Sequence, residues 1–137
     1  MAYGKPLPTT TIGNMAFWEG LKEHQFKVPH CRDCGTYNWI PYPACKNCQS
    51  ENLDWTPVSG KATVWTYSIV HRGAGFHQTP YVVAVAKLDV DSPRSCLVLA
   101  TLIDVNPDDV HIGMPVKIGY EDIPEEDMTM YHLTPTT

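Results

Sequence analysis

The spacing of hydrophobic residues changes along the chain and divides it into stretches with different expected structures. Residues 1–13 are rich in Pro, Thr and Gly and show no hydrophobic period, which is typical of an extended arm. Phe17 and Leu21 then follow Asn14 at helical spacing, and Asn14 is a residue type that can cap a helix. The pattern predicts a short helix over about residues 14–24.

From Gly60 onwards the pattern is that of β-strands. Residues 62–70 are a long run of β-forming residues, and simple alternation places four of them on one face: Thr63, Trp65, Tyr67 and Ile69. Further strands are predicted at residues 81–88, 96–103 and 116–120, with turns at 71–80, 91–94 and 106–108. Short strands at even spacing indicate a small antiparallel barrel. This pattern shows four strands, and the Asp- and Glu-rich residues 121–127 lead into what is expected to be a short tail.

Two CxxC pairs lie between the helix and the strands. They are Cys31-Arg-Asp-Cys34 and Cys45-Lys-Asn-Cys48. Two residues between cysteines allow both sulfurs of a tight turn to point at one centre, and two such turns make a tetrahedral thiolate cage for Zn²⁺. A site closed by four sulfurs stabilises a fold and leaves no open position for chemistry. The motif therefore predicts a structural zinc, with Cys31, Cys34, Cys45 and Cys48 as its ligands.

Other interpretations of the cysteines remain open. A redox CxxC normally opens a helix within a strand–helix–strand pattern, which this sequence lacks. Iron in a rubredoxin-like site is a rival, because four thiolates also bind iron. The fifth cysteine, Cys96, lies in a strand that is apolar on both faces, so we expect a buried, unreactive thiol.

Composition and charge narrow the class of protein. The chain has 137 residues with 43% hydrophobic and 18% charged side chains, which suits a globular protein of one or two small domains. It has no apolar run long enough to span a membrane and no apolar core of a signal peptide at its start, and reduced thiolates fit a cytoplasmic location. Residues 1–59 carry five basic and five acidic side chains, whereas residues 60–137 carry five and ten, giving the net charge of −5. That balance disfavours binding to phosphate backbones.

A helix, a four-cysteine ribbon and a barrel, in that order, resemble the zinc-ribbon/OB-fold proteins that accompany thiolase-like enzymes of acyl-CoA metabolism. The residues that carry this resemblance lie in six segments: residues 17–21 (FWEGL), 31–35 (CRDCG), 41–48 (PYPACKNC), 58–64 (VSGKATV), 80–81 (PY) and 112–116 (IGMPV). The resemblance implies a mainly β fold. An N-terminal arm and helix span residues 1–25, a rubredoxin-like zinc ribbon spans 26–58, and a five-stranded OB-fold barrel with the acidic segment spans 59–137. The barrel's fifth strand comes from the resemblance alone.

The resemblance also implies a function. Members of this family look like small non-catalytic subunits that pair with a thiolase, a condensing synthase or a retro-aldolase. We therefore expect a hetero-oligomer with a thiolase-like catalytic subunit, an acyl-CoA of aromatic or steroid type as the shared substrate, and no catalytic residue in this chain. The alternatives are a free-standing acyl-CoA-binding protein and, less favoured, a module that binds single-stranded nucleic acid.

Two groups of side chains are candidates for contact with the partner or with CoA. Trp and Tyr dominate interface hot spots, and one face of a short helix cannot bury two adjacent rings, so the first group is Phe17, Trp18, Trp39 and Tyr42. The second group surrounds a loop with two glycines after the first barrel strand, at the expected mouth of the barrel: His71, Arg72, Phe76, His77 and Tyr81. Arg72 could meet a carboxylate or a CoA phosphate. A solvated loop is the plain alternative, and no adjacent nucleophile or orienting carboxylate supports catalysis by its histidines.

Overall fold

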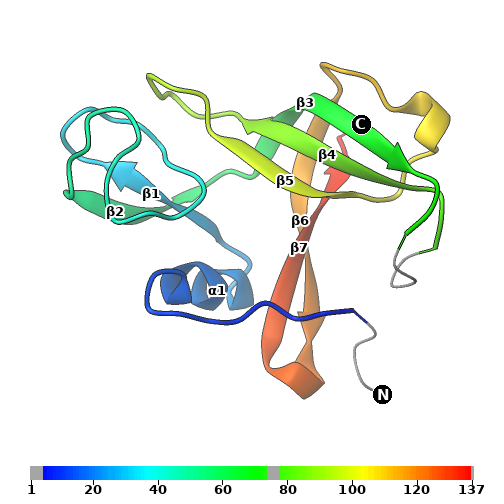
Figure 1. Ribbon diagram of the computed structural model, residues 1–137, viewed down its shortest axis with the longest axis horizontal. Coiled ribbons are helices and arrows are strands. Elements are labelled where there is room, and N and C mark those ends of the chain that lie inside the picture. The colour runs from blue at the N-terminus through cyan, green and yellow to red at the C-terminus, as the bar shows by residue number, and fades with distance from the viewer. Residues whose placement is uncertain (1–4, 74–77, 137) are drawn as a thin grey trace.

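The computed structural model describes residues 5–73 and 78–136, which form a helix, a two-stranded ribbon and a barrel (Figure 1). Helix α1 spans Met15–Lys22, and strand β1 (Phe26–Cys31) pairs antiparallel with β2 (Leu53–Val58). The barrel strands are β3 (Lys61–Val70), β4 (Tyr81–Leu88), β5 (Leu97–Leu102), β6 (Pro115–Ile123) and β7 (Met128–Pro135). Short 3₁₀ turns lie at Pro107–Asp109 (η1) and Pro124–Glu126 (η2). The expected fold class is confirmed.

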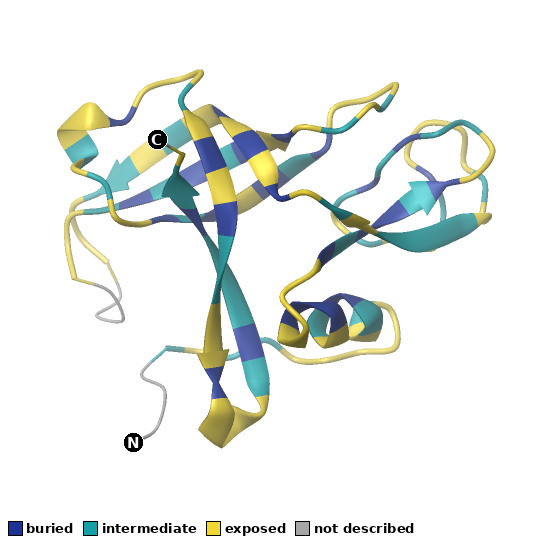
Figure 2. Cartoon of the chain, turned by 180° about the vertical axis from the view of Figure 1, so that it is seen from behind, coloured by how far each residue is buried: buried dark blue, intermediate teal, exposed yellow. Residues whose placement is uncertain are grey.

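The barrel closes in the order β3-β4-β5-β7-β6. The pairs β3–β4, β4–β5 and β6–β7 are long antiparallel ladders, whereas β5 and β7 run parallel and share one residue pair, Leu102 with Leu133. Its interior is filled by the alternate residues of each strand, among them Val64, Val82, Val98 and Leu133, which are buried (Figure 2). Small side chains in β4 and β5 leave room for these larger ones, because a narrow barrel has little interior volume.

Helix α1 begins one residue after Asn14, near the predicted boundary. The Asn14 side chain does not cap the helix; its Oδ1 accepts a 2.7 Å hydrogen bond from the Thr11 backbone N–H and closes the turn before it. Phe17, Gly20 and Leu21 form the buried face. A Cβ at Gly20 would lie 3.1 Å from the Gln25 carbonyl oxygen, so glycine allows the chain to turn back closely from α1 into β1.

The predicted single face of residues 63–69 is wrong, because the register of β3 shifts between Val64 and Thr66. A β-bulge places one extra residue in the strand and moves the following side chains to the other face. Thr63 and Trp65 therefore point outwards, whereas Tyr67 and Ile69 pack against the core.

The expectation of a tail after residue 127 is also wrong. Residues 128–135 form β7, which pairs with β6 along its whole length from Met128–Ile123 to Pro135–Val116. The acidic segment is the end of β6 and the turn of this hairpin, and Asp127 adopts a left-handed conformation (φ 50°) where the chain reverses. The fifth barrel strand implied by the resemblance is thus β7.

A group of aromatic rings joins the helix, the ribbon and the barrel. The Phe17 ring lies 4.9–5.6 Å from the ring centroids of Trp18, Phe26 and Tyr131, and 4.6 Å from that of Trp39. These partners come from α1, β1, β7 and the ribbon, so one side chain contacts all three parts of the fold. Among the described residues, no helix is long and apolar enough to cross a membrane.

Candidate metal centre and partner-facing surfaces

The four cysteines lie on two turns of the same shape. Cys31 ends β1, and the Gly35 N–H donates to its carbonyl at 3.0 Å; the Gln49 N–H donates to the Cys45 carbonyl at 2.8 Å. Gly35 and Gln49 follow the second cysteine of each pair, and both have positive φ, 83° and 64°. Each turn folds both of its sulfurs towards the other turn.

The sulfur atoms are arranged as a tetrahedral ion requires. All four Sγ atoms lie within 4.8 Å of one another, with Cys31–Cys48 and Cys34–Cys45 each 3.6 Å apart. Four sulfurs at about 2.3 Å from Zn²⁺ lie about 3.8 Å from each other. Among the described residues this is the one cluster of His, Cys, Asp or Glu side chains that could share an ion. The residues present therefore fit a structural zinc ion.

The surroundings of these thiols shift their pKa values in opposite directions. Thr36 and then Asn47 hydrogen-bond to the Cys34 sulfur and lower its pKa to about 6. At Cys48 the Ser50 backbone N–H lowers the pKa, but burial and the neighbouring sulfurs raise it further, to about 12. Four thiolates at this distance therefore need a cation, and a divalent ion supplies the missing charge.

Two buried polar residues hold the turns together. Asn38 is 3% exposed, and its Oδ1 accepts from the Lys46 N–H at 2.9 Å while its Nδ2 donates to the Thr36 carbonyl at 3.3 Å. The Thr36 carbonyl also accepts from the Cys31 N–H at 2.9 Å. The hydrophobic pattern does not predict that Asn38 and Thr36 are buried, because both are polar. The sequence feature that could have indicated their role is their position between the two CxxC pairs.

The first group of predicted contact residues separates into buried and exposed members. Phe17 is 2% exposed and belongs to the core, so the expectation of a partner-facing anchor does not hold for it in this conformation. Trp18 and Trp39 are half-buried, and the Trp18 Nε1–H is buried without a hydrogen-bond acceptor among the described residues. Tyr42 is 72% exposed beside Ile40, which is 77% exposed. Residues 40–42, called the ribbon loop below, thus present an apolar surface to their surroundings.

The second group lies around the loop after β3. His71 and Arg72 are exposed, and Phe76 and His77 lie outside the described residues. Tyr81 lies against Gly73, where a Cβ would stand 3.2 Å from its ring. Tyr81 also borders a hollow of about 890 Å³ between the start of β4, the end of β5 and the β6–β7 hairpin. Its lining includes the half-buried His132, and burial lowers the pKa of that imidazole.

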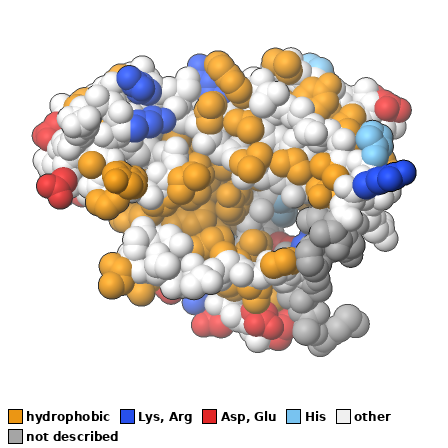
Figure 3. Space-filling view, in the orientation of Figure 1, with side chains coloured by type: hydrophobic (Ala, Val, Ile, Leu, Met, Phe, Trp, Pro, Cys, Tyr) orange, Lys and Arg blue, Asp and Glu red, His pale blue; other side chains and the backbone are white. Residues whose placement is uncertain are grey.

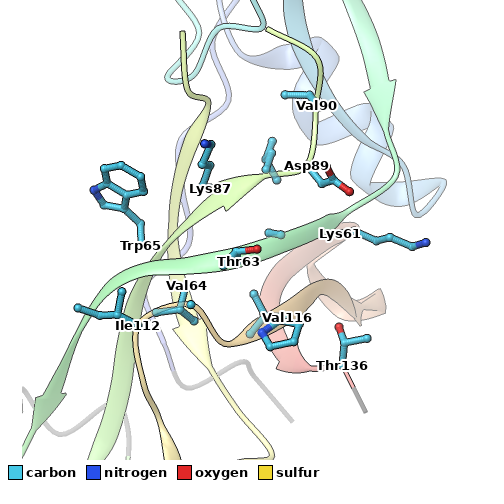
Figure 4. A pocket seen from close by; sticks show the side chains of 14 residues that line it. Lys61, Thr63, Val64, Trp65, Lys87, Asp89, Val90, Ile112, Val116 and Thr136 are labelled. Atoms are coloured by element: carbon cyan, nitrogen blue, oxygen red, sulfur yellow. The ribbon is translucent and has the colours of Figure 1, made fainter.

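A second hollow, of about 700 Å³, lies on the outer face of the barrel between β3, the end of β4 and the loop before β6 (Figure 4). Trp65 points outwards and is 51% exposed, and Lys87 Nζ stands 5.9 Å from its ring centroid. Ile112 forms the opposite wall and is 68% exposed. The sequence did not single out Trp65 or Ile112 as exposed, because alternation shows which residues of a strand share a face but not which face is outward.

Known proteins match both parts of the chain. Residues 18–54 match the ChsH2 rubredoxin-like zinc ribbon domain, and residues 55–121 match the ChsH2 C-terminal OB-fold domain. A DUF35 domain-containing scaffold protein of Methanocaldococcus jannaschii is 31% identical, covering 80% of this chain and 77% of its own length. A solved structure described as an Ltp2-ChsH2(DUF35) aldolase superposes with a TM-score of 0.82 at 26% identity, covering 96% of this chain and all of that chain.

Two other relatives are parts of enzymes that act on CoA thioesters. The alpha subunit of 3-oxo-4,17-pregnadiene-20-carboxyl-CoA hydratase from Mycobacterium tuberculosis is 29% identical over 86% of this chain. The chain spans 37% of that subunit's length. Subunit BbsA of benzoylsuccinyl-CoA thiolase from Geobacter metallireducens is 27% identical over 69% of this chain and 65% of its own length.

Proposed function

This chain belongs to the DUF35 family of ChsH2-type zinc-ribbon/OB-fold scaffold proteins, and from that premise we propose that it is a non-catalytic subunit of an acyl-CoA enzyme. It docks on a thiolase-fold catalytic subunit and completes or covers the acyl-CoA site of that partner. The observation that carries the proposal is the structural likeness, over nearly the whole chain, to the ChsH2 component of an aldolase.

The chemistry of the described residues supports a role without catalysis. The four sulfurs fill the coordination sphere of a tetrahedral ion, so this centre has no position for substrate. Cys96 is fully buried, and burial raises the pKa of its thiol to about 11, which keeps it protonated and unreactive. The reacting groups then come from the partner.

The substrate class follows from the relatives. The hydratase and thiolase to which the chain is similar act on CoA thioesters of a steroid acid and of an aromatic acid. We propose a CoA thioester with a bulky ring-bearing acyl group for the complex. Arg72 and His71, both exposed beside Tyr81, are the proposed contacts for the partner or for CoA.

Co-expression tests the proposal. The chain is produced together with a thiolase-fold protein from the same organism, and turnover of a ring-bearing acyl-CoA is measured for the complex and for each component. We expect a stable complex, reduced activity of the partner alone and no turnover by this chain. Full activity of the isolated partner would overturn the proposal. Calorimetry with the lone chain and a CoA thioester tests the alternative of a free-standing carrier, which micromolar binding would support.

A pair of variants tests docking by the ribbon loop. Ile40→Asp places a charge on a side chain that is 77% exposed, and Ile12→Asp places the same charge on the arm, where the side chain is 95% exposed. We expect the first to weaken the complex and the second to leave it unchanged. Equal affinities would show that the partner does not cover the ribbon loop.

A further inference from the structure

Strand β5 has an edge that the barrel leaves open. Its one residue pair with β7 is Leu102–Leu133, at its last residue, whereas its ladder with β4 extends over the whole strand. Figure 1 shows β5 as the outer strand of the β3–β4–β5 layer, approaching β7 at one end. The rest of β5 is therefore paired with a strand on one side, and on the other side the Tyr131 side chain reaches its Leu99 carbonyl.

Hydrogen bonds at both ends of β5 show which backbone groups face outwards. The Cys96 carbonyl accepts from the Leu88 N–H at 2.9 Å. The backbone N–H and C=O groups of the even-numbered residues of β5 therefore bond to β4. The Ile103 N–H donates to the Leu133 carbonyl, and the Leu99 carbonyl accepts from the Tyr131 hydroxyl at 3.3 Å. Odd-numbered residues thus point away from β4. The N–H groups of Leu97, Leu99 and Thr101 have no acceptor in the part of the chain that the structure describes. These three residues are called the open edge of β5 below.

The side chains beside the open edge are apolar. Leu99 is 59% exposed and stands directly opposite Val85, and Val83 stands opposite Thr101. Apart from Lys87 and Thr101, β4 and β5 are apolar on their outer as well as their inner faces, a pattern typical of strands that are covered on both sides. Figure 3 shows hydrophobic side chains gathered between the ribbon, α1 and the barrel on this face. An uncovered aliphatic edge strand is a ready template for another strand.

Charge differs between the two ends of the edge. Lys87 stands opposite Leu97, and Arg94 and Lys46 hold the turn before β5 through hydrogen bonds to Asn47 and to the Ser95 carbonyl. Asp104 follows the other end. A strand that enters here is favoured if its acidic end lies beside Lys87 and Arg94.

We propose that an extended segment of the catalytic partner, aliphatic and acidic at one end, adds to the open edge of β5 as an additional strand. Backbone hydrogen bonds would hold it, and its alternate side chains would cover Leu99 and Val85. This inference rests on the proposed function, because it adds a surface of this chain through which the same partner is bound.

Amide hydrogen exchange resolved to single residues tests the inference on the purified complex with the thiolase-fold subunit. We expect the N–H groups of Leu97, Leu99 and Thr101 to exchange at least about tenfold more slowly in the complex than in the free chain. Val98 and Ala100 already bond to β4, so their exchange is slow in both states and serves as the internal control. Unchanged exchange at the open edge in a complex that does form overturns this inference and leaves the proposed function standing. Failure to form any complex overturns both.

Two substitutions separate strand addition from simple burial. Leu99→Pro removes an N–H that points away from β4, so the β4 ladder remains, but an added strand loses a donor. We expect affinity for the partner to fall about tenfold or more with little change in the melting temperature of the free chain. Lys87→Glu should slow association at low salt, whereas Lys117→Glu, on β6, should not. An unchanged affinity of the folded Leu99→Pro protein would contradict the inference.

Discussion

At the scale of single residues, Gly119 shows how tightly β6 and β7 are paired. It lies opposite His132, and a Cβ at this position would overlap with His132 Nε2. We expect Gly119→Ala to lower the free energy of unfolding by about 1–3 kcal/mol, because the ring must leave its place against the strand. Denaturant titration measures the loss. The double variant Gly119→Ala/His132→Ala should recover much of it, and a purely additive double variant would show that the ring is not the cause.

The cysteines give a second prediction at this scale. Elemental analysis should find about one zinc per chain in the unchanged protein. Cys34→Ser removes one of four sulfurs, and we expect it to abolish this zinc content, because the site then lacks a complete set of thiolates. Cys96→Ala is the matched control, since its sulfur is buried in the barrel and outside the metal cluster. Loss of zinc from the Cys96 variant, or its retention in the Cys34 variant, would contradict the assignment of ligands.

At the scale of elements, one ring joins α1 to the other two parts of the fold. Phe17 contacts Phe26 of the ribbon and Tyr131 of the barrel, so its removal weakens the packing of the helix against both. We expect Phe17→Ala to lower the free energy of unfolding by about 3–5 kcal/mol, the cost of emptying a buried aromatic site. Ile12→Ala, on a side chain that is 95% exposed, should change it by less than about 0.5 kcal/mol. If Phe17→Ala lowers the free energy of unfolding no more than Ile12→Ala does, the contacts of the Phe17 ring do not stabilise the fold.

The elements that sequence could and could not predict differ for physical reasons. The helix, the ribbon and four strands follow from spacing and turn residues. Strand β7 does not, because one of its inward residues is polar: Thr129 is 4% exposed and donates to Asp122 at 2.7 Å, so hydropathy does not alternate there. The inward position of Tyr67 and Ile69 depends on the bulge, a register shift that no residue type in β3 predicts.

The same contrast holds for the site. The spacing of the cysteines predicts the metal ligands, because the CxxC turn has one local geometry whatever surrounds it. Partner-facing residues depend on which surfaces the tertiary fold covers. Phe17 and Tyr42 are both aromatic, yet the first is in the core and the second is 72% exposed.

At the scale of the whole molecule, the ribbon and the barrel should differ in their dependence on metal. The ribbon around the sulfurs is too small to fold by itself, and zinc contributes on the order of 10–16 kcal/mol to comparable peptides. The barrel has its own core of valine, alanine and leucine. We expect strong chelation to unfold residues 32–52 while β3–β7 remain folded.

Limited proteolysis with and without chelator measures this difference. Cleavage should appear between β1 and β2 first, and a fragment that holds the barrel should persist. Simultaneous loss of both parts would show that the shared aromatic rings make the molecule one cooperative unit. If the barrel stays folded, zinc that is added back before the protease should restore the resistance of the ribbon to cleavage.

The contact between Phe17 of the first helix and Tyr131 of the last strand has a consequence for biosynthesis. Tyr131 lies on β7, far along the chain from Phe17, so during translation α1 lacks this part of its cover until β7 has left the ribosome. Until then the nascent chain exposes part of the hydrophobic surface of α1, and chaperones have a defined segment to shield.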